Sequence, residues 1–519
     1  MPKRKPTEGV LALDLGTSSV RAVVYDPQGR MDETSLSDLP YKVQTKEPGE
    51  VSSNPDPLVE LITQSIDQAL KAARKQNVAI VAAATSCYWH SLVGVDKNGR
   101  PTTELLTWAD TRSAAEAQQL RRTADERDYH ERTGCFFHAS YWPAKLRWLA
   151  TTRDATVRRT ARWISLGEYL YRELFGDAPV SLSMASGTGL LDVNRCQWDE
   201  DGLRLAGITA EQLSSLTDWS EPCRSLRPRF ARRWPELRDI PWYLPVGDGA
   251  LANVGAGAVT PQWACATIGT SSALRVILTA DRLTIPWGTF VYRLDRNRFV
   301  LGGALSEGGN VVRWFTGGLG LKKKQLEREA GAVAPDSHGL TVLPFWAGER
   351  SPNWRGDARA VISGISLATQ PAHLLRAAME AISYQFVAVA DAMERAMLSR
   401  PQSLIGTGGQ LVHSPVWSQM LADALNMPVS ISPEPEASSR GAALLALHVL
   451  GKMPRLWSTS PPRGRRYQPR ERIHHIYARA RQRQARLYEA LVGSSDGTAS
   501  GVPESGSRTT GLRTPSAKH

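Results

Sequence analysis

One short phrase occurs twice in this chain of 519 residues, and both copies carry groups that can hold an anion. The copies read DLGTSSVR at residues 14–21 and TIGTSSALR at residues 267–275. Each is an apolar run, a Gly-Thr-Ser-Ser turn and a second apolar run, which predicts a tight β-hairpin. Glycine permits the sharp turn, and the hydroxyl and freed N–H groups at its tip can hold an anion. The candidate contacts are Thr17, Ser18, Ser19 and Arg21 in the first copy and Gly269, Thr270 and Ser271 in the second.

An acidic residue, Asp14, ends the apolar run of the first copy. An unpaired carboxylate at the end of a buried strand is costly. It becomes favourable when it faces a Mg²⁺ ion bound to phosphate. No G-x-x-x-x-G-K-[ST] sequence occurs, so a P-loop is excluded as the phosphate site. The two hairpins predict two similar lobes that hold a polyphosphate from both sides.

The pattern around the hairpins predicts an α/β architecture. The first half should contain strands at 10–15, 20–25 and 78–84 and a helix at 57–75. The second half should contain a strand at 403–405, a glycine-rich turn at 406–409 and helices at 414–426, 438–450 and 475–491. The predicted organisation is an N-terminal arm at 1–9, a first lobe at 10–258, a second lobe at 259–492 and a disordered tail at 493–519.

The composition is that of an ordinary globular protein. The chain is 42% hydrophobic and 22% charged. At 519 residues, this hydrophobic content is sufficient to form the cores of two or three domains. Its five cysteines are widely spaced without a C-x-x-C pair, which argues against a disulfide framework or a zinc site. The apolar run near the start is too short for a signal peptide or a membrane span. We therefore expect a cytoplasmic protein with no membrane partner.

The net charge of +12 raises the question of nucleic-acid binding. Residues 452–486 hold ten arginines and one lysine against one acidic residue, which is +10 for this segment alone. The rest of the chain is close to neutral. A basic C-terminal segment is more typical of a solvated helix face, so no nucleic-acid partner is expected.

Three glycine-rich turns together resemble the nucleotide motifs of the superfamily of actin, hexokinase and the chaperone ATPases. Within it, the sequence is most similar to the FGGY carbohydrate kinases. Their C-terminal signature is matched at every position by Ala360, Ile362, Gly364-Ile365, His373-Leu374 and Ala377-Ala378-Met379-Glu380. Their N-terminal signature is matched by Ser140, Lys145, Leu146, Trp148, Leu149 and Thr151, whereas Trp142 and Thr152 depart from it. The resemblance implies two actin/hexokinase-like (ribonuclease H-like) lobes, with ATP and Mg²⁺ in the cleft between them and Asp14 facing the metal.

The resemblance also implies roles for other residues. Asp248, which opens the Gly-Asp segment before the second hairpin, corresponds to the family's catalytic base; its alternative role is to cap the helix that follows. Gly408 and Gly409 would lie against the adenosine. The segments that contact the sugar in the family contain Trp89, His90, Trp108, Asp110 and Arg112. For His90 a structural role is an equal alternative, and Arg112 is a candidate for contacting a substrate carboxylate.

The expected function is ATP-dependent phosphorylation of a small sugar or sugar acid. Residues 248–255 look most like those of gluconate kinases, which predicts D-gluconate as substrate and 6-phosphogluconate as product. A xylulokinase, or another ketose or polyol kinase, is the alternative within the family. A non-catalytic nucleotide-binding protein, actin-like or chaperone-like, is the alternative from another class. A homodimer is left open.

Overall fold

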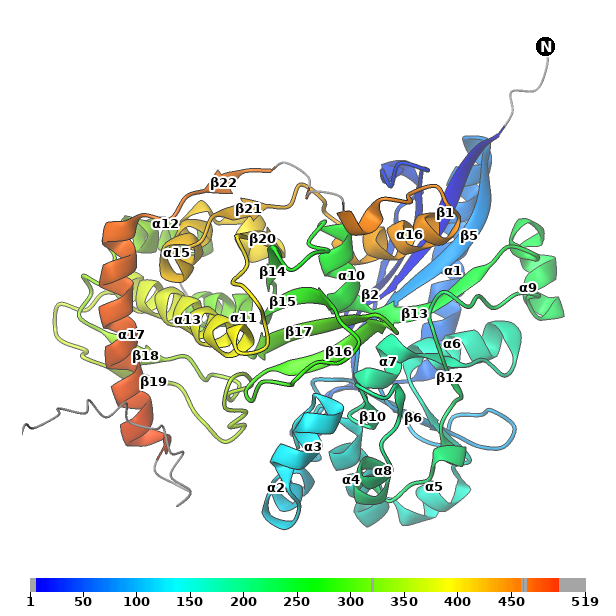
Figure 1. Ribbon diagram of the computed structural model, residues 1–519, viewed down its shortest axis with the longest axis horizontal. Coiled ribbons are helices and arrows are strands. Elements are labelled where there is room, and N and C mark those ends of the chain that lie inside the picture. The colour runs from blue at the N-terminus through cyan, green and yellow to red at the C-terminus, as the bar shows by residue number, and fades with distance from the viewer. Residues whose placement is uncertain (1–5, 319–321, 459–460, 462–463, 494–519) are drawn as a thin grey trace, which may run out of the picture.

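Two mixed β-sheets form the centres of the two halves of the chain, and helices cover their faces (Figure 1). The computed structural model describes residues 6–318, 322–458, 461 and 464–493. The predicted tail lies outside the described residues from residue 494 onward. Among the described residues, no helix has the length and apolar character needed to cross a bilayer.

The first sheet contains five strands. Their order is β13 (Trp242–Gly247), β5 (Val78–Cys87), β1 (Thr7–Leu15), β2 (Ser19–Tyr25) and β3 (Ser37–Pro40). β1, β2 and β3 are antiparallel, whereas β5 and β13 run parallel to β1. The register of the first hairpin pairs Asp14 with Arg21, so both side chains lie on one face.

The second sheet contains seven strands. Their order is β16 (Phe290–Asp295), β17 (Arg298–Leu305), β15 (Ser272–Thr279), β14 (Trp263–Ile268), β20 (Ser403–Thr407), β21 (Val429–Ile431) and β22 (Arg466–Tyr467). Its central five strands repeat the first sheet, with antiparallel β17, β15 and β14 followed by β20 and β21 parallel to β14. The hairpins therefore occupy equivalent places in two ribonuclease H-like lobes, which confirms the predicted fold class.

Helices of five to 24 residues accompany the two sheets. They are α1 (Pro55–Lys75), α6 (Leu166–Phe175) and α10 (Asp248–Gly255) in the first half, and α11 (Gly309–Arg313), α12 (Lys323–Ala332), α13 (Pro371–Glu394), α14 (Gly409–His413), α15 (Pro415–Leu425), α16 (Ala437–Val449) and α17 (Glu471–Leu491) in the second. Local signals fix their ends. Asn54 caps α1, and Ser414 caps α15 through its hydroxyl, as its position before a proline predicted.

Between β5 and β13 the chain builds a separate group of short elements, most of which lie at the lower right of Figure 1. Its helices are α2 (Ala114–Thr123), α3 (Glu126–Thr133), α4 (Trp142–Thr152), α5 (Asp154–Arg159), α7 (Leu182–Ser186), α8 (Glu200–Ala206) and α9 (Pro228–Arg233). Its strand pairs, including β4 before this stretch, are β4 (Ser52–Ser53) with β7 (Leu105–Leu106), β6 (Val93–Val95) with β8 (Arg162–Ile164), β9 (Val180–Ser181) with β12 (Leu216–Thr217), and β10 (Leu191–Asp192) with β11 (Gln197–Trp198). A similar small pair in the second half joins β18 (Thr341–Leu343) to β19 (Val361–Ser363). The group between β5 and β13 carries the expected sugar-contacting segment at 108–112.

α10 follows β13, and α16 follows β21; these strands are equivalent in the five-stranded arrangement that the two sheets share. The two helices cross each other between the sheets (Figure 1). The crossing is close because glycines lie at the contact. A Cβ at Gly255 would lie 1.8 Å from Ala437 O, and a Cβ at Gly441 would lie 2.1 Å from Leu251 O. α16 also bonds to the first sheet, where the Tyr25 and Ser439 hydroxyls lie 2.9 Å apart. Although α16 comes from the second half of the sequence, it packs against the first half.

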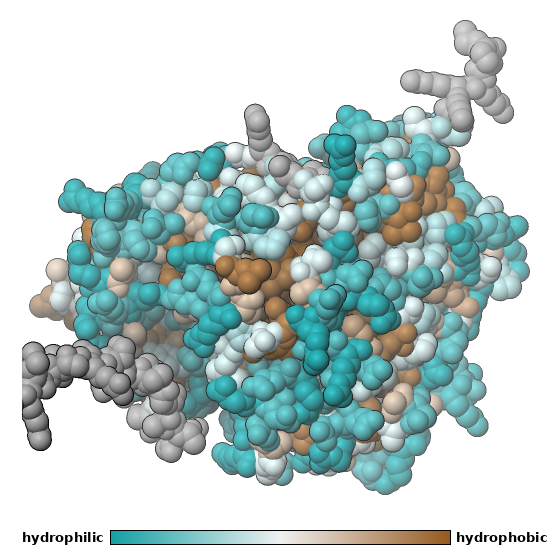
Figure 2. All heavy atoms as spheres, in the orientation of Figure 1, coloured by the Kyte–Doolittle hydropathy of each residue, from teal (hydrophilic) through white to brown (hydrophobic). Residues whose placement is uncertain are grey.

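The strand β1 begins at Thr7, inside the stretch expected to be a loose arm. Parallel pairing with β5 supplies the reason, since Thr7 N–H donates to Asn77 O at 3.1 Å and extends the ladder. Apolar side chains gather where the two halves meet, and hydrophilic residues cover most of the outer parts (Figure 2).

Candidate active site

The first hairpin presents its turn where β1 ends, with Asp14 directly beneath it. The turn is closed by a 3.1 Å bond from Gly16 N–H to Ser19 O, and the Ser18 side chain is exposed. Asp14 is buried, and this burial raises the pKa of its carboxyl group. A buried carboxylate with a raised pKa is stabilised by a nearby cation, and carboxylate oxygens are ligands that Mg²⁺ prefers. The chemistry of this position therefore fits a metal ion.

The neighbouring Arg21 already has acidic partners. Its guanidinium lies 3.4 Å from Asp14, 3.1 Å from Asp38 and 3.5 Å from Glu436. A direct contact from Arg21 to phosphate would compete with these three carboxylates. In this arrangement Arg21 holds the hairpin against the start of α16.

The second hairpin is supported by two glycine-containing turns. A 2.9 Å bond from Gly269 N–H to Ser271 O closes it, and Gly309 N–H donates to Gly269 O at 2.7 Å. Gly408 lies against the same strand end, because its φ is +82° and a Cβ there would lie 2.6 Å from Ile268 O. Around Gly409, by contrast, a Cβ would meet only His413, at 4.0 Å. The candidate nucleotide residues of the second half thus lie together.

Asp248 lies between the two hairpins, as the first residue of α10. Burial raises the pKa of Asp248 to about 6; Arg275, on the strand after the second hairpin, opposes this effect, and Asp14, beneath the first, adds to it. The side chain is partly exposed, and one oxygen accepts Gly249 N–H at 2.7 Å. Gly247 occupies the cap position, so the capping role considered for Asp248 is not observed. A carboxyl group with a pKa close to neutrality suits proton transfer.

Trp89 packs against the backbone that leads from β13 into Asp248. A Cβ at Gly247 would lie 1.9 Å from Trp89 Cε2, and one at Gly187 would lie 2.3 Å from Trp89 Cδ1. The indole N–H donates to Ser183 O at 2.9 Å. The two glycines therefore make room for an indole that supports the backbone beneath Asp248.

His90 has a defined tautomer. Its Nδ1 lies in hydrogen-bond contact with Gly187 O, and since a carbonyl can only accept, Nδ1 carries the proton. Burial lowers the pKa of His90 to about 3, so the ring is neutral at physiological pH. Nε2 is then a hydrogen-bond acceptor, suited to a substrate hydroxyl. The backbone of His90 has φ +69°, an uncommon conformation outside glycine that often marks functional sites.

The segment at 108–112 divides into two parts. Trp108 is held by a 2.8 Å bond from Ser140 Oγ to its carbonyl. Asp110 and Arg112 bond to each other at 2.7 Å, and Arg112 also pairs with Glu47 at 2.7 Å and Glu104 at 3.3 Å. The guanidinium of Arg112 additionally lies 4.6 Å from the centre of the Trp148 ring. The polar groups of Asp110 and Arg112 are therefore already bonded to other residues of the protein, which gives both residues a structural role.

Lys145, which sequence reasoning treated only as part of a signature, joins the two sugar segments. Its buried ammonium donates to His90 O at 2.7 Å and to Thr107 O at 2.8 Å. Burial lowers the pKa of Lys145 to about 7. On the same helix, Trp142 donates to Ser91 O at 3.1 Å, so the residue that departs from the family signature anchors the same loop.

The second half contributes residues that sequence reasoning missed. Tyr292 lies 4.7 Å from Trp89 between ring centres, and its hydroxyl lies 2.7 Å from that of Tyr141. Trp354 stacks on Phe136 at 4.8 Å, and Arg350 lies beside it. These residues are more than 100 positions from the first-half partners, and no local sequence signal connects them.

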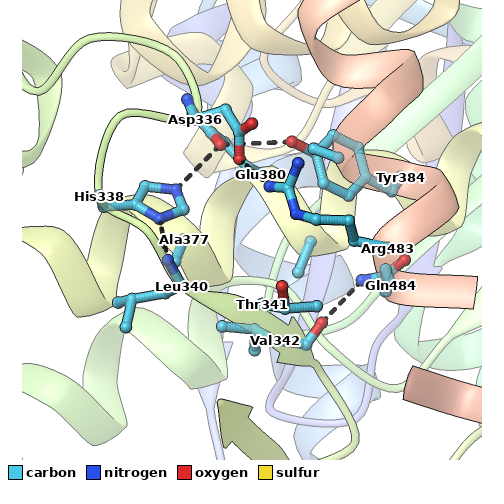
Figure 3. Close-up of a pocket in the computed structure, with 12 residues that line it drawn as sticks. Asp336, His338, Leu340, Thr341, Val342, Ala377, Glu380, Tyr384, Arg483 and Gln484 are labelled. Carbon is cyan, nitrogen blue, oxygen red and sulfur yellow. Dashed lines mark hydrogen bonds and ion pairs between the residues drawn. The ribbon is translucent and has the colours of Figure 1, made fainter. Parts of the chain in front are cut away.

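The C-terminal signature ends at Glu380, which lies in a different cluster (Figure 3). Its buried carboxylate accepts from Arg376 at 2.6 Å, from His338 Nε2 at 3.1 Å and from the Tyr477 hydroxyl at 3.2 Å. Potential metal-ligating atoms of Asp336, His338 and Glu380 lie within 4.8 Å of one another. Arginines already pair with both carboxylates. The cluster therefore joins α13 to α17 and has a structural role.

Two adjoining family models match the chain over most of its length. The N-terminal domain of the FGGY family of carbohydrate kinases matches residues 9–255, and the C-terminal domain of that family matches residues 264–450. The chain belongs to the FGGY family of carbohydrate kinases. FGGY membership makes it a phosphotransferase that uses ATP, which disfavours the non-catalytic actin-like or chaperone-like alternative.

Relatives within the FGGY family carry different names. A gluconokinase of Bacillus subtilis (strain 168) is 28% identical over 86% of this chain and 88% of its own length. A glycerol kinase of Alkalilimnicola ehrlichii is 31% identical over 86% of this chain and 90% of its own length. The crystal structure of gluconate kinase from Lactobacillus acidophilus has a TM-score of 0.87 at 24% identity, covering 94% of this chain and 99% of that one. The comparisons thus place the chain in a family of small-molecule sugar kinases.

Proposed function

We propose that this FGGY kinase phosphorylates D-gluconate to 6-phosphogluconate, with Asp248 as the general base. The observation that carries the catalytic assignment is the position of Asp248 between the two hairpins, with a pKa of about 6. The gluconate assignment is supported by the gluconokinase relative and by the likeness of residues 248–255 to gluconate kinases.

The proposed reaction is a direct phosphoryl transfer. The oxygen of the substrate's terminal hydroxyl forms a bond to the γ-phosphorus of ATP, and the bond from that phosphorus to the β,γ-bridging oxygen breaks, releasing ADP. The hydroxyl proton passes to the Asp248 carboxylate. His90 Nε2 would accept a hydrogen bond from another substrate hydroxyl, and Trp108 would lie against the carbon chain. The Gly269–Ser271 turn and Gly408-Gly409 would hold the nucleotide.

Asp14 is the residue that would hold a magnesium ion, since its buried carboxylate fits a cation. When bound, the ion would neutralise charge on the phosphate oxygens. We expect Asp14→Asn to raise the Mg²⁺ concentration needed for half-maximal activity. ATP binding without metal should change less.

A substrate panel tests the proposal. The release of ADP is measured at fixed Mg-ATP with gluconate, xylulose, glycerol and other polyols, and kcat/KM values are compared. A clear preference for gluconate is the expected result. A preference for xylulose or glycerol would contradict the gluconate assignment and leave the kinase activity standing, because a ketose or polyol kinase would use the same base and nucleotide site.

A further inference from the structure

Arg350 reaches across the boundary between the two halves. It lies in the loop between β18 and β19, yet its guanidinium carbon is 5.7 Å from the centre of the Trp108 ring on the opposite half. The same carbon is 5.7 Å from the ring of Trp354. These separations are within the range of cation–π contacts. Arg350 therefore faces the segment expected to contact the sugar.

The Nε of Arg350 lacks a partner, although the side chain as a whole is only partly buried. Its Nε is buried and forms no hydrogen bond, and within the described part of the chain no carboxylate makes an ion pair with Arg350. A guanidinium carries five N–H donors, and buried donors in native proteins are normally satisfied. The described residues therefore supply no hydrogen-bond acceptor for Arg350 Nε.

The charge of Arg350 is also poorly balanced by its surroundings. Its field acts on two imidazoles, and burial together with this field lowers the pKa values of both His90 and His138, so both are neutral. Burial raises the pKa of Glu307, also within its field, to about 8, and the pKa of Glu349 to about 7. Glu307 is thus mostly protonated at neutral pH. Other groups within the field include the hydroxyls of Tyr141 and Tyr292 and the cation of Arg275.

Arg112 provides the contrast. It was the sequence candidate for binding a substrate carboxylate, but three carboxylates already surround it. A substrate anion at Arg112 would have to displace one of them. At Arg350 no such exchange is required.

We infer that Arg350 receives the carboxylate of a sugar-acid substrate and so distinguishes aldonates from neutral polyols. This inference rests on the proposed function. An arginine can bond a carboxylate through two parallel N–H groups, which is stronger and more directional than a neutral contact. The carboxylate and the terminal hydroxyl of an open-chain aldonate lie at opposite ends of the molecule. The substrate would therefore extend from Arg350, past Trp108 and His90, toward Asp248.

The test compares a charged ligand with a neutral analogue. Binding of D-gluconate and of D-glucitol, which has a hydroxymethyl group in place of the carboxylate, is measured by titration calorimetry. The kcat/KM values are measured at saturating Mg-ATP. Arg350→Gln should weaken gluconate binding by about 10- to 150-fold, the range for a lost hydrogen bond to a charged group. Its values for glucitol and the KM for ATP should stay near those of the wild type. The affinity of Arg350→Lys for gluconate should lie between those of the wild type and Arg350→Gln.

Arg112→Gln is the matched comparison. Because Arg112 supports the loop through framework contacts, its loss should affect gluconate and glucitol alike. An equal loss for both ligands in Arg350→Gln would overturn the inference, since it would assign Arg350 to the phosphoryl group or to loop structure. Unchanged gluconate binding would also overturn it. If the wild-type protein prefers gluconate in either case, the proposed function survives; a wild type with no aldonate activity would overturn both.

Discussion

At the scale of single residues, the environment of Asp248 ties catalysis to a cost in stability. Burial raises the pKa of Asp248 from 3.8 to about 6. Between these values the native state binds more protons than the unfolded state, so the free energy of unfolding falls as pH rises through this interval. The ionised base is thus a destabilising group at neutral pH, and the same environment poises it for proton transfer.

Asp248→Asn should separate these two effects. We expect a loss of kcat of about 10²- to 10⁴-fold, because the asparagine amide cannot accept the proton. The melting temperature at pH 7 should stay the same or rise, and the wild-type kcat should fall as pH drops below about 6. Steady-state kinetics and thermal unfolding measure both quantities. Asp239→Asn, the same change at an exposed position, is the control; a kcat near the wild-type value in Asp248→Asn would refute the base assignment.

The sequence pointed to functional residues that lie within a recognisable local motif, and it did not point to residues whose role depends on distant parts of the chain. Asp14 stands out because it ends an apolar strand, and the repeated hairpin phrase draws attention to Gly269. Tyr292 and Arg350 carry no such signal, because their partners come from the other half of the chain. Tertiary structure alone shows which of the arginines is saturated with carboxylates.

At the scale of elements, α4 holds together the two segments expected to contact the sugar, at 89–90 and 108–112; this contact is called the clamp below. Lys145 holds the carbonyls of His90 and Thr107. The family signature marked this helix, but its match did not reveal that the ammonium faces inward. Two loops that are separate in sequence are thereby held by the amino group of one side chain.

Removing this clamp should affect the sugar more than the nucleotide. We expect Lys145→Met to raise the KM for the sugar at least about tenfold, because buried carbonyls without donors cost about 1–3 kcal/mol each. The KM for ATP should change little. Arg147→Met, on the same helix, is the control. Equal changes in both KM values would indicate general unfolding of the site and contradict the clamp.

The turn between β20 and α14 offers a paired test of the nucleotide site. Gly408→Ala should lower the melting temperature and raise the KM for ATP, because φ is +82° and Ile268 O would be only 2.6 Å from the new Cβ. A Cβ at Gly409 would have open space around it, so Gly409→Ala should keep the melting temperature of the wild type. If adenosine lies against this turn, Gly409→Ala should still raise the KM for ATP. An unchanged KM for ATP in Gly409→Ala would remove Gly409 from the site.

The basic C-terminal segment illustrates what sequence could and could not predict at this scale. Its helix was expected, and α17 covers Glu471–Leu491. Its charges were expected to be solvated, and Arg472, Arg479 and Arg486 are exposed. Two further arginines also form ion pairs, Arg470 with Asp423 at 2.6 Å and Arg481 with Asp391 at 2.5 Å. Arg483 also pairs with Asp336. Such pairing depends on neighbouring helices, and it ties α17 to the second half.

At the scale of the whole molecule, candidate residues for one reaction are divided between two halves. The first half carries Asp14, His90 and Asp248, and the second carries the Gly269 turn and Arg350. The repeated topology was predictable from the repeated hairpin. The packing of α16 against the first half was not, because sequence order places it in the second.

Binding of both ligands should draw the halves together. Closure excludes water from the γ-phosphoryl group while the hydroxyl approaches it. Small-angle X-ray scattering should show a smaller radius of gyration with a non-hydrolysable ATP analogue plus gluconate than with either alone. Asp248→Asn should close similarly, because its change is confined to the base. An unchanged radius with both ligands would contradict closure.

The crossing of α10 and α16 has a consequence for the accuracy of such a motion. In any rotation, displacement grows with distance from the axis, so points near the axis stay almost still. The candidate base opens one of the two crossing helices, and its carbonyl accepts a hydrogen bond from Ser438 at 3.2 Å, beside the start of the other. A rotation about this crossing would carry the outer phosphate and sugar contacts over long arcs while the carboxylate remained nearly fixed. The proton acceptor would then serve as the stationary reference around which both substrates are aligned.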